Sequence, residues 1–120
     1  MKIQVAGFLL MLLSAVELCE GLRRINAMTK QQCDAVMAAE VNNGRGCQHT
    51  ETFIVATLDA VNAACQNVNE ALATFPVVDC TRKMRANGCV YEGNAHGASK
   101  VKLQCANGQV VNYVSVVRLA

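Results

Sequence analysis

Two histidines, His49 and His96, are the side chains of this chain that titrate near neutral pH and therefore suit proton transfer in catalysis. His49 follows Gln48 in an extended stretch, where neighbouring side chains point to opposite faces. His96 lies within Glu92–Gly97, which we expect to form a flexible loop between strands. We therefore interpret both histidines as exposed loop residues, and a stand-in catalytic role for either of them is the alternative.

Seven cysteines in a chain of 120 residues form the second chemically distinctive group. Aromatic residues make up 4% of the chain and tryptophan is absent, which leaves little bulk for a hydrophobic core. We therefore expect disulfide bridges to supply part of the stability. A zinc site is the rival interpretation, but no Cys-x-x-Cys pair occurs, and we expect neither a metal nor a cofactor.

The first twenty-one residues have the layout of a secretory signal peptide. A basic start at Lys2 is followed by the apolar run Val5–Leu13 and by the small and polar segment Ser14–Gly21. The apolar run is shorter than the roughly 20 residues that span a bilayer, so a signal anchor is the weaker alternative. We predict cleavage before Leu22, a mature domain over residues 22–120, and a secreted, extracellular protein.

Cleavage changes both the cysteine count and the charge. It removes Cys19 and leaves an even number of cysteines for an oxidising compartment. It also removes one basic and two acidic residues, so the net charge rises from +2 to +3. Such a mild excess permits weak attraction to polyanions but does not by itself indicate a nucleic-acid-binding protein.

One basic cluster stands out in the mature chain, between Cys80 and Cys89. Its members are Arg82, Lys83 and Arg85. Most such clusters are solvated faces of the protein. The alternative is a patch that binds glycosaminoglycan, anionic lipid or RNA without base specificity.

Two short helices are predicted in the first half of the domain. Thr29 and Gln32 have the spacing of a capping box, which predicts a helix over Cys33–Val41, ended by two asparagines and a glycine. Thr57 caps a second predicted helix over Leu58–Cys65. The residues expected on the buried face of this second helix are Leu58, Val61 and Cys65.

Strands dominate the second half, and they suggest an α+β domain whose helices pack against an antiparallel sheet. The predicted strands are Glu51–Val55, Phe75–Cys80, Lys100–Cys105 and Gln109–Val117. Pro76 marks its strand as an edge or a strand start. Alternation predicts that Val101, Leu103 and Cys105 share the buried face, and Asn107-Gly108 predicts a type I′ hairpin turn.

The segment from Cys47 to Ile54, C-Q-H-T-E-T-F-I, resembles the C-K-x-x-N-T-F signature of the pancreatic ribonuclease (RNase A) superfamily. Cys33 lies fourteen residues before Cys47 and Cys65 lies eighteen after it, as in that family. The tail C-A-N-G-Q-V-V-N-Y resembles the family's C-E-N-G-x-P-V-H-[FL], especially in its angiogenin-like branch.

The resemblance implies a fold of short helices on a strongly bent antiparallel sheet with three disulfides. It implies the pairs Cys33–Cys80, Cys47–Cys89 and Cys65–Cys105, without the fourth bridge that is commoner in the family. Each bridge closes a long loop and would stabilise the fold by about 3–4 kcal/mol.

The same resemblance implies that the catalytic residues are lost. The position of the family's lysine holds Gln48, the position of the histidine on its last strand holds Asn112, and no histidine lies between Leu22 and Cys33. A count back from Cys33 at the shorter family spacing reaches Arg24, which stays protonated and cannot act as a base. We therefore expect no catalytic residue here, and whether the protein is an enzyme at all is doubtful.

One binding position persists. Thr52 matches the family threonine that hydrogen-bonds a pyrimidine base, and the alternative is that Thr52 is an ordinary strand residue. Glu51 replaces the family asparagine and adds negative charge near the expected phosphate, which weighs against tight RNA binding.

We thus expect a secreted, non-catalytic, monomeric RNase A-superfamily protein that acts by surface binding. Its expected partners are RNA, glycosaminoglycan or another polyanion, bound weakly, or an extracellular receptor. Host defence, signalling and a reproductive role all fit. The alternatives are a weakly active, pyrimidine-preferring ribonuclease and a cationic antimicrobial protein.

Overall fold

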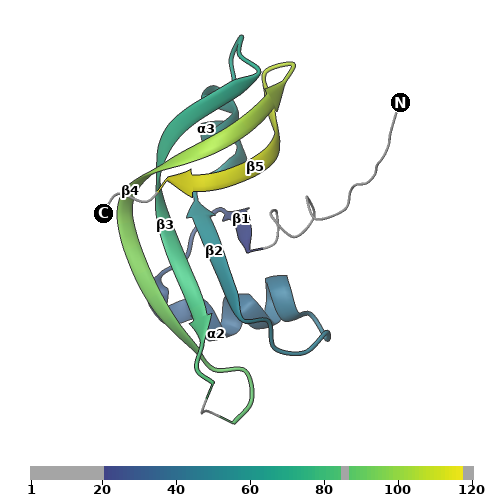
Figure 1. Ribbon diagram of the computed structural model, residues 1–120, viewed down its shortest axis with the longest axis vertical. Coiled ribbons are helices and arrows are strands. Elements are labelled where there is room, and N and C mark those ends of the chain that lie inside the picture. The colour runs from purple at the N-terminus through teal and green to yellow at the C-terminus, as the bar shows by residue number, and fades with distance from the viewer. Residues whose placement is uncertain (1–20, 85–86, 118–120) are drawn as a thin grey trace.

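The structure, a computed structural model, describes residues 21–84 and 87–117 (Figure 1). Within these residues five strands form one sheet in the order β1-β2-β3-β4-β5. The strands are β1 (Leu22–Ile25), β2 (Thr50–Val55), β3 (Glu70–Arg82), β4 (Tyr91–Ala106) and β5 (Gln109–Val117). The predicted leader lies outside the described residues except for Gly21.

The sheet is antiparallel except at one edge, where β1 runs parallel to β2 with Leu22 opposite Thr52. Figure 1 shows β3 and β4 curving along the length of the molecule, with α2 near one end and α3 near the other. This bent α+β architecture confirms the predicted fold class. Strand β1 was not predicted, because four residues carry too little pattern to indicate a strand whose partner lies far along the chain.

The first predicted helix is present but irregular. It comprises a 3₁₀ turn η1 (Lys30–Gln32), α2 (Cys33–Val36) and a π-helical segment η2 (Met37–Asn42). The capping box is present, and the Thr29 backbone N–H donates to Gln32 Oε1 at 2.7 Å. Asn43, with φ of 38°, ends the helical segment as predicted.

The second helix, α3 (Leu58–Ala63), starts at the predicted cap. Thr57 Oγ1 accepts the Ala60 backbone N–H at 3.1 Å. The predicted buried face is wrong at Leu58, which is 47% exposed. The residues that pack into the core from this part of the chain are Val61, Ala64 and Cys65, so the contact with the sheet involves the end of the helix rather than its beginning.

Strand β3 is longer than predicted, and Pro76 lies inside it. The pairing of β3 with β2 ends at Val77, opposite Ile54, and the register with β4 shifts between Pro76 and Val77. Proline is tolerated there because it has no N–H to donate and β2 provides no partner at that point. The proline therefore marks the place where one side of β3 becomes an edge.

The predictions for the last third of the chain are largely confirmed. Val101, Leu103 and Cys105 are buried on one face of β4. Asn107 and Gly108 have φ of 55° and 76°, as a type I′ turn requires. The predicted loop around His96 is wrong, however, because these residues belong to β4 and His96 pairs with Val77 of β3.

The core consists of two clusters on opposite faces of the sheet. Neighbouring residues of β2 separate between them: Phe53 belongs to the first and Ile54 to the second. The first cluster contains Met28, Cys33, Met37, Val41, Phe53, Val78, Cys80 and Tyr91. The second contains Ile54, Val61, Cys65, Phe75, Val77, Val101, Leu103 and Cys105.

Three disulfides hold these layers together with the pairing that the resemblance implied. Cys33–Cys80 lies in the first cluster and Cys65–Cys105 in the second, while Cys47–Cys89 joins two loops. Such a framework is typical of proteins in oxidising compartments. Among the helices that the structure describes, none has the length and apolar character to cross a bilayer.

Candidate functional site

The backbone of Gln48 is held from both sides by buried side chains. The Tyr91 hydroxyl donates to the Gln48 carbonyl oxygen at 2.6 Å, and the Gln48 N–H donates to Asn42 Oδ1 at 2.9 Å. Asn42 Nδ2 in turn donates to the Tyr91 hydroxyl at 3.2 Å. Since buried hydrogen bonds are costly to break, Gln48 occupies a rigid position just before β2.

The side chain at this position is neutral and borders a cavity. Gln48 Nε2 reaches the Gly46 carbonyl oxygen at 3.4 Å, a long and weak contact. The cavity measures about 370 Å³, and we call it the Gln48 cavity. It is lined by Gly21, Arg23, Val41, Arg45, Gln48, His49, Thr50 and Glu51.

An ion pair between β1 and β2 forms one wall of the Gln48 cavity. Arg23 Nε donates to Glu51 Oε2 at 2.8 Å, and Arg23 Nη1 donates to the Glu40 carbonyl oxygen at 2.5 Å. The side chain of Glu51 is only 5% exposed, and a buried carboxylate needs a partner for its charge. The Arg23 guanidinium is that partner. The negative charge that Glu51 was expected to add near the phosphate is therefore paired with the Arg23 guanidinium.

Arg24, the residue indicated by the spacing before Cys33, does not reach this cavity. Its Nη1 donates to the Ala56 carbonyl oxygen at 2.9 Å and to Asn26 Oδ1 at 2.6 Å. Successive residues of a strand face opposite ways, so β1 turns Arg23 toward Glu51 and Arg24 away from it. Only a prediction of β1 as a strand could have identified Arg23.

Burial raises the pKa of the Tyr113 phenol above its ordinary value of 10.0, and the neighbouring Arg24 guanidinium partly opposes this shift. A raised folded-state pKa means that Tyr113 stabilises the fold below pH 10 and that this stability is lost as pH rises through the folded pKa. We expect Arg24→Met to raise the pKa of Tyr113 further, measured by NMR titration of its ring. Arg23→Met is the control, because the Arg23 guanidinium binds Glu51, and it should leave the pKa of Tyr113 unchanged. A lower pKa of Tyr113 in Arg24→Met would contradict the influence of Arg24 on this phenol.

Asn112, which the resemblance matches to the family's final-strand histidine, lies on β5 beside a neutral side chain. Its Nδ2 donates to Gln104 Oε1 at 3.2 Å, and the two residues are register partners. Within the described residues, neither Asn112 nor Thr52 lines the Gln48 cavity. The structure therefore does not gather Gln48, Asn112 and Thr52 around this cavity.

Three side chains on adjacent strands form a hydrogen-bonded chain that includes Thr52. The Thr52 hydroxyl donates to Asp79 Oδ1 at 2.7 Å, and His96 Nε2 lies 2.8 Å from Asp79 Oδ2. Thr52 and Asp79 are register partners of β2 and β3. The hydroxyl hydrogen of Thr52 is thus directed at the Asp79 carboxylate.

The two histidines do not share a site. His49 is exposed on the loop before β2, as predicted, and lines the Gln48 cavity. His96 lines a different cavity, between β4 and the end of β5. The two histidines of the described residues therefore line different cavities.

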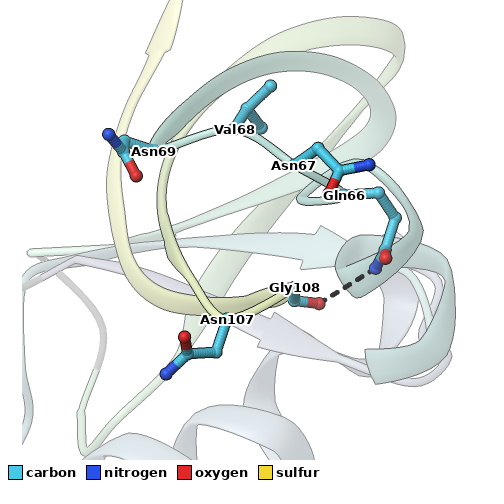
Figure 2. A pocket seen from close by; sticks show the side chains of 6 residues that line it. All are labelled: Gln66, Asn67, Val68, Asn69, Asn107 and Gly108. Atoms are coloured by element: carbon cyan, nitrogen blue, oxygen red, sulfur yellow. Dashed lines mark hydrogen bonds between the residues drawn. The ribbon is translucent and has the colours of Figure 1, made fainter.

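A further cavity, shown in Figure 2, is lined mostly by side-chain amides. It measures about 360 Å³ and lies between the end of α3 and the hairpin turn; its lining is Gln66, Asn67, Val68, Asn69, Asn107 and Gly108. Gln66 Nε2 donates to the Gly108 carbonyl oxygen at 3.1 Å. This cavity was not predicted, although three amide residues lie close together after Cys65 in the sequence.

The predicted polyanion patch is described only in part. Arg82 is half-buried at the end of β3, and its Nε is buried without a hydrogen-bond partner among the described residues. Lys83 is exposed, and Arg85 lies outside the described residues. No group of three or more metal-ligating side chains occurs in the part of the chain that the structure describes.

Comparison with known proteins identifies the family. The family model of pancreatic ribonuclease matches residues 22–116. The fold is similar to that of SS-RNase-2 lacking residues 116–120, with 26% identity and a TM-score of 0.62 over 79% of this chain and 91% of that chain. Zebrafish RNase5 is 31% identical, with a TM-score of 0.56 over 76% and 84% of the two chains.

A more distant structure has the same fold: green turtle egg white ribonuclease, at 17% identity, has a TM-score of 0.56 over 83% of this chain and 94% of that chain. A search of curated protein sequences gives no match. The family model covers most of the chain, and the disulfide pairing is the one that the resemblance implies. The protein belongs to the pancreatic ribonuclease family.

Proposed function

We propose that this protein is a secreted member of the family that does not cleave RNA and acts by binding at its surface. One observation carries this proposal: the rigidly held position of Gln48 presents a neutral amide, beside an arginine that is paired with Glu51. The cysteine framework and a family match that begins at residue 22 support secretion after removal of residues 1–21.

Cleavage of RNA through its 2′-hydroxyl needs a base, an acid and a cation. Gln48 carries no charge, Asn112 does not titrate, and Arg23 stays protonated and cannot accept a proton. The remaining carboxylate of the Gln48 cavity, Glu51, is bound to Arg23. Loss of one acid–base partner typically costs about 10²–10⁴-fold in rate, and here both partners and the cation are replaced.

We expect the purified, oxidised protein to release no acid-soluble product from tRNA or poly(C). The double variant Gln48→Lys, Asn112→His should also fall short of a family enzyme, because no described residue replaces the missing N-terminal histidine. Gln104→His, the register partner of Asn112, is a matched control for adding a histidine to this region. Turnover by the wild-type protein that disappears in Thr52→Ala or His49→Ala would refute the proposal.

The second candidate function is a weak, pyrimidine-preferring ribonuclease. The hydrogen bond from Thr52 to Asp79 favours it, because it orients the hydroxyl at the position that the family uses for base recognition. The Thr52 variant above separates the two functions, since a residual enzyme would lose its base preference together with its turnover.

The third candidate is a cationic protein that binds polyanions, including those of microbial surfaces, through Arg82, Lys83 and Arg85. The exposed side chain of Lys83 supports this function. Arg82 supports it less, because its side chain is half-buried and its Nε is not accessible to a ligand. Heparin affinity that falls steeply with salt, and falls again when Lys83 and Arg85 are neutralised, would favour this patch.

We expect the protein to be a monomer. An extracellular receptor is an alternative partner to a polyanion.

A further inference from the structure

Part of β4 has an edge with no strand beside it. β5 pairs with β4 only from Ala106 back to Lys100, where β5 ends at Val117. Among the described strands, residues Asn94–Ser99 of β4 therefore have only β3 beside them. Figure 1 shows β4 continuing past the end of β5 along this side of the molecule. A free stretch of this size is about 20 Å long, which is the length of an ordinary strand.

The beginning of the same edge is covered by the first helical segment. The Tyr91 N–H donates to Asp34 Oδ1 at 2.7 Å, so this N–H points away from β3. The direction of the backbone groups alternates along an antiparallel strand, and no register shift lies between Tyr91 and Ala95. The N–H and C=O of Ala95 therefore also point away from β3, toward the free edge.

The free stretch lacks the usual protection of an exposed strand edge. Natural sequences protect such edges with lysines, prolines or covering segments. Residues 94–99, N-A-H-G-A-S, contain neither lysine nor proline, and all of them except Ser99 are exposed. A bulge at Gly97, where the register with β3 shifts, limits regular pairing at that point. On both sides of the bulge the backbone is accessible to a strand from another chain.

A cavity of about 650 Å³ lies along this edge, and the charge of its lining restricts the partner. Lys100 is exposed and forms no ion pair with a described residue. His96 also lines the cavity, but its Nε2 is already 2.8 Å from Asp79 Oδ2. The lining contains no acidic side chain; it comprises Thr74, Ala95, His96, Gly97, Ala98, Ser99, Lys100 and Val117. A carboxylate is therefore the complementary group for Lys100.

We propose that the free edge of β4 binds an extended peptide segment of a protein partner, with an acidic side chain of the peptide beside Lys100. The peptide adds a strand antiparallel to β4, in line with β5, and main-chain hydrogen bonds such as those of Ala95 hold it. The exposed Val117 and the small side chains of Ala95 and Ala98 leave room for apolar side chains of the peptide. This inference rests on the proposed function of surface binding, and it names the surface and the class of partner.

The test is an NMR titration of the processed protein with the synthetic peptide acetyl-Thr-Val-Thr-Val-Glu-Val-Thr-amide. The peptide should bind with a dissociation constant of about 0.1 mM. At about 1 mM peptide, hydrogen exchange of the Ala95 amide should slow about tenfold, because only the unbound protein exposes it. In the free protein this amide should exchange rapidly. Slow exchange there would mean that residues 118–120 or a second copy already cover the edge, and it would overturn the proposal.

Two variants separate main-chain pairing from charge. Ala95→Pro removes an N–H that points away from β3, which an edge strand tolerates, and it should weaken peptide binding at least about tenfold. Lys100→Gln should weaken binding about threefold, as expected for an exposed ion pair. Lys102→Gln is the matched control and should leave the affinity unchanged, because β5 pairs with β4 at Lys102 through Ser115.

A second peptide, with glutamine in place of glutamate, completes the test and covers the case in which Ala95→Pro does not fold. It should bind the wild type about threefold more weakly than the first peptide and should bind Lys100→Gln as well as the first peptide does. Binding that survives Ala95→Pro, or equal losses in Lys100→Gln and Lys102→Gln, would overturn the proposal. RNA cleavage by the wild-type protein would refute the proposed function and leave this edge standing as a binding surface.

Discussion

Replacement of Gly93 by alanine is expected to lower the free energy of unfolding by about 3 kcal/mol or more. An added Cβ would lie 2.1 Å from the carbonyl oxygen of Lys30, and 2.8 Å and 2.9 Å from its carbonyl carbon and Cα. All three are backbone atoms of η1, so no side chain can rotate away to relieve the clash. The turn that begins the first helix must therefore move away from β4.

Thermal unfolding measures this effect directly. A loss of about 3 kcal/mol corresponds to a fall in Tm of roughly 12 °C or more for a domain of this size. Gly97→Ala, in the same strand, is the matched control because nothing lies within 4 Å of its added Cβ. Equal Tm values for the two variants would show that η1 does not pack against Gly93 in solution.

Removal of the Cys33–Cys80 bridge is the second change with a large expected effect. The bridge joins residues 47 positions apart, and the loop-closure entropy it removes from the unfolded chain is worth about 4 kcal/mol. Both cysteines are almost fully buried, at 1% and 0% exposed, in the first core cluster. The double alanine variant should therefore lose this entropy and also leave a small cavity.

The Cys47–Cys89 pair provides the comparison for this prediction. Its separation of 42 residues gives nearly the same entropic contribution, but Cys89 is exposed and neither residue belongs to the core clusters. Urea unfolding of the two double alanine variants should show a larger loss of stability without Cys33–Cys80. Equal losses of stability would mean that the burial of Cys33–Cys80 contributes nothing beyond the entropy of loop closure.

The predicted elements that proved correct are those with strong local signals. The capping box at Thr29, the cap at Thr57, the alternation from Val101 to Cys105 and the Asn107-Gly108 turn all involve residues close in sequence. Each depends on hydrogen bonds or side-chain alternation within a few residues, which the sequence displays directly.

The predictions that failed depend on distant pairing. Residues around His96 include glycines and an asparagine, which disfavour strands, yet β3 pairs with all of them except Gly97, where the register shifts. Gly93 itself is required by the approach of Lys30, some sixty residues earlier in the chain. Local propensity pointed to a loop because the partner strand that overrides it is not visible nearby.

The candidate site divides in the same way. The resemblance seen in the sequence placed Gln48 and Asn112, both neutral, at positions where we expect the family to have charged or titratable residues. It also singled out Thr52, but not its bond to Asp79 or the contact of Asp79 with His96. Arg23 was passed over in favour of Arg24, because the choice depends on the face of a strand that was not predicted.

By itself, the sequence determined the family and the cysteine framework, and it led us to expect that the family's catalytic groups are absent, because these are matters of residue identity and spacing. Only the tertiary structure decided which side chains meet: Tyr91 and Asn42 around the backbone of Gln48, Arg23 with Glu51, and Thr52 with Asp79. These contacts join strands and loops that are far apart along the chain, and their formation depends on strand register and face. A change of one residue in register would reverse every one of those faces.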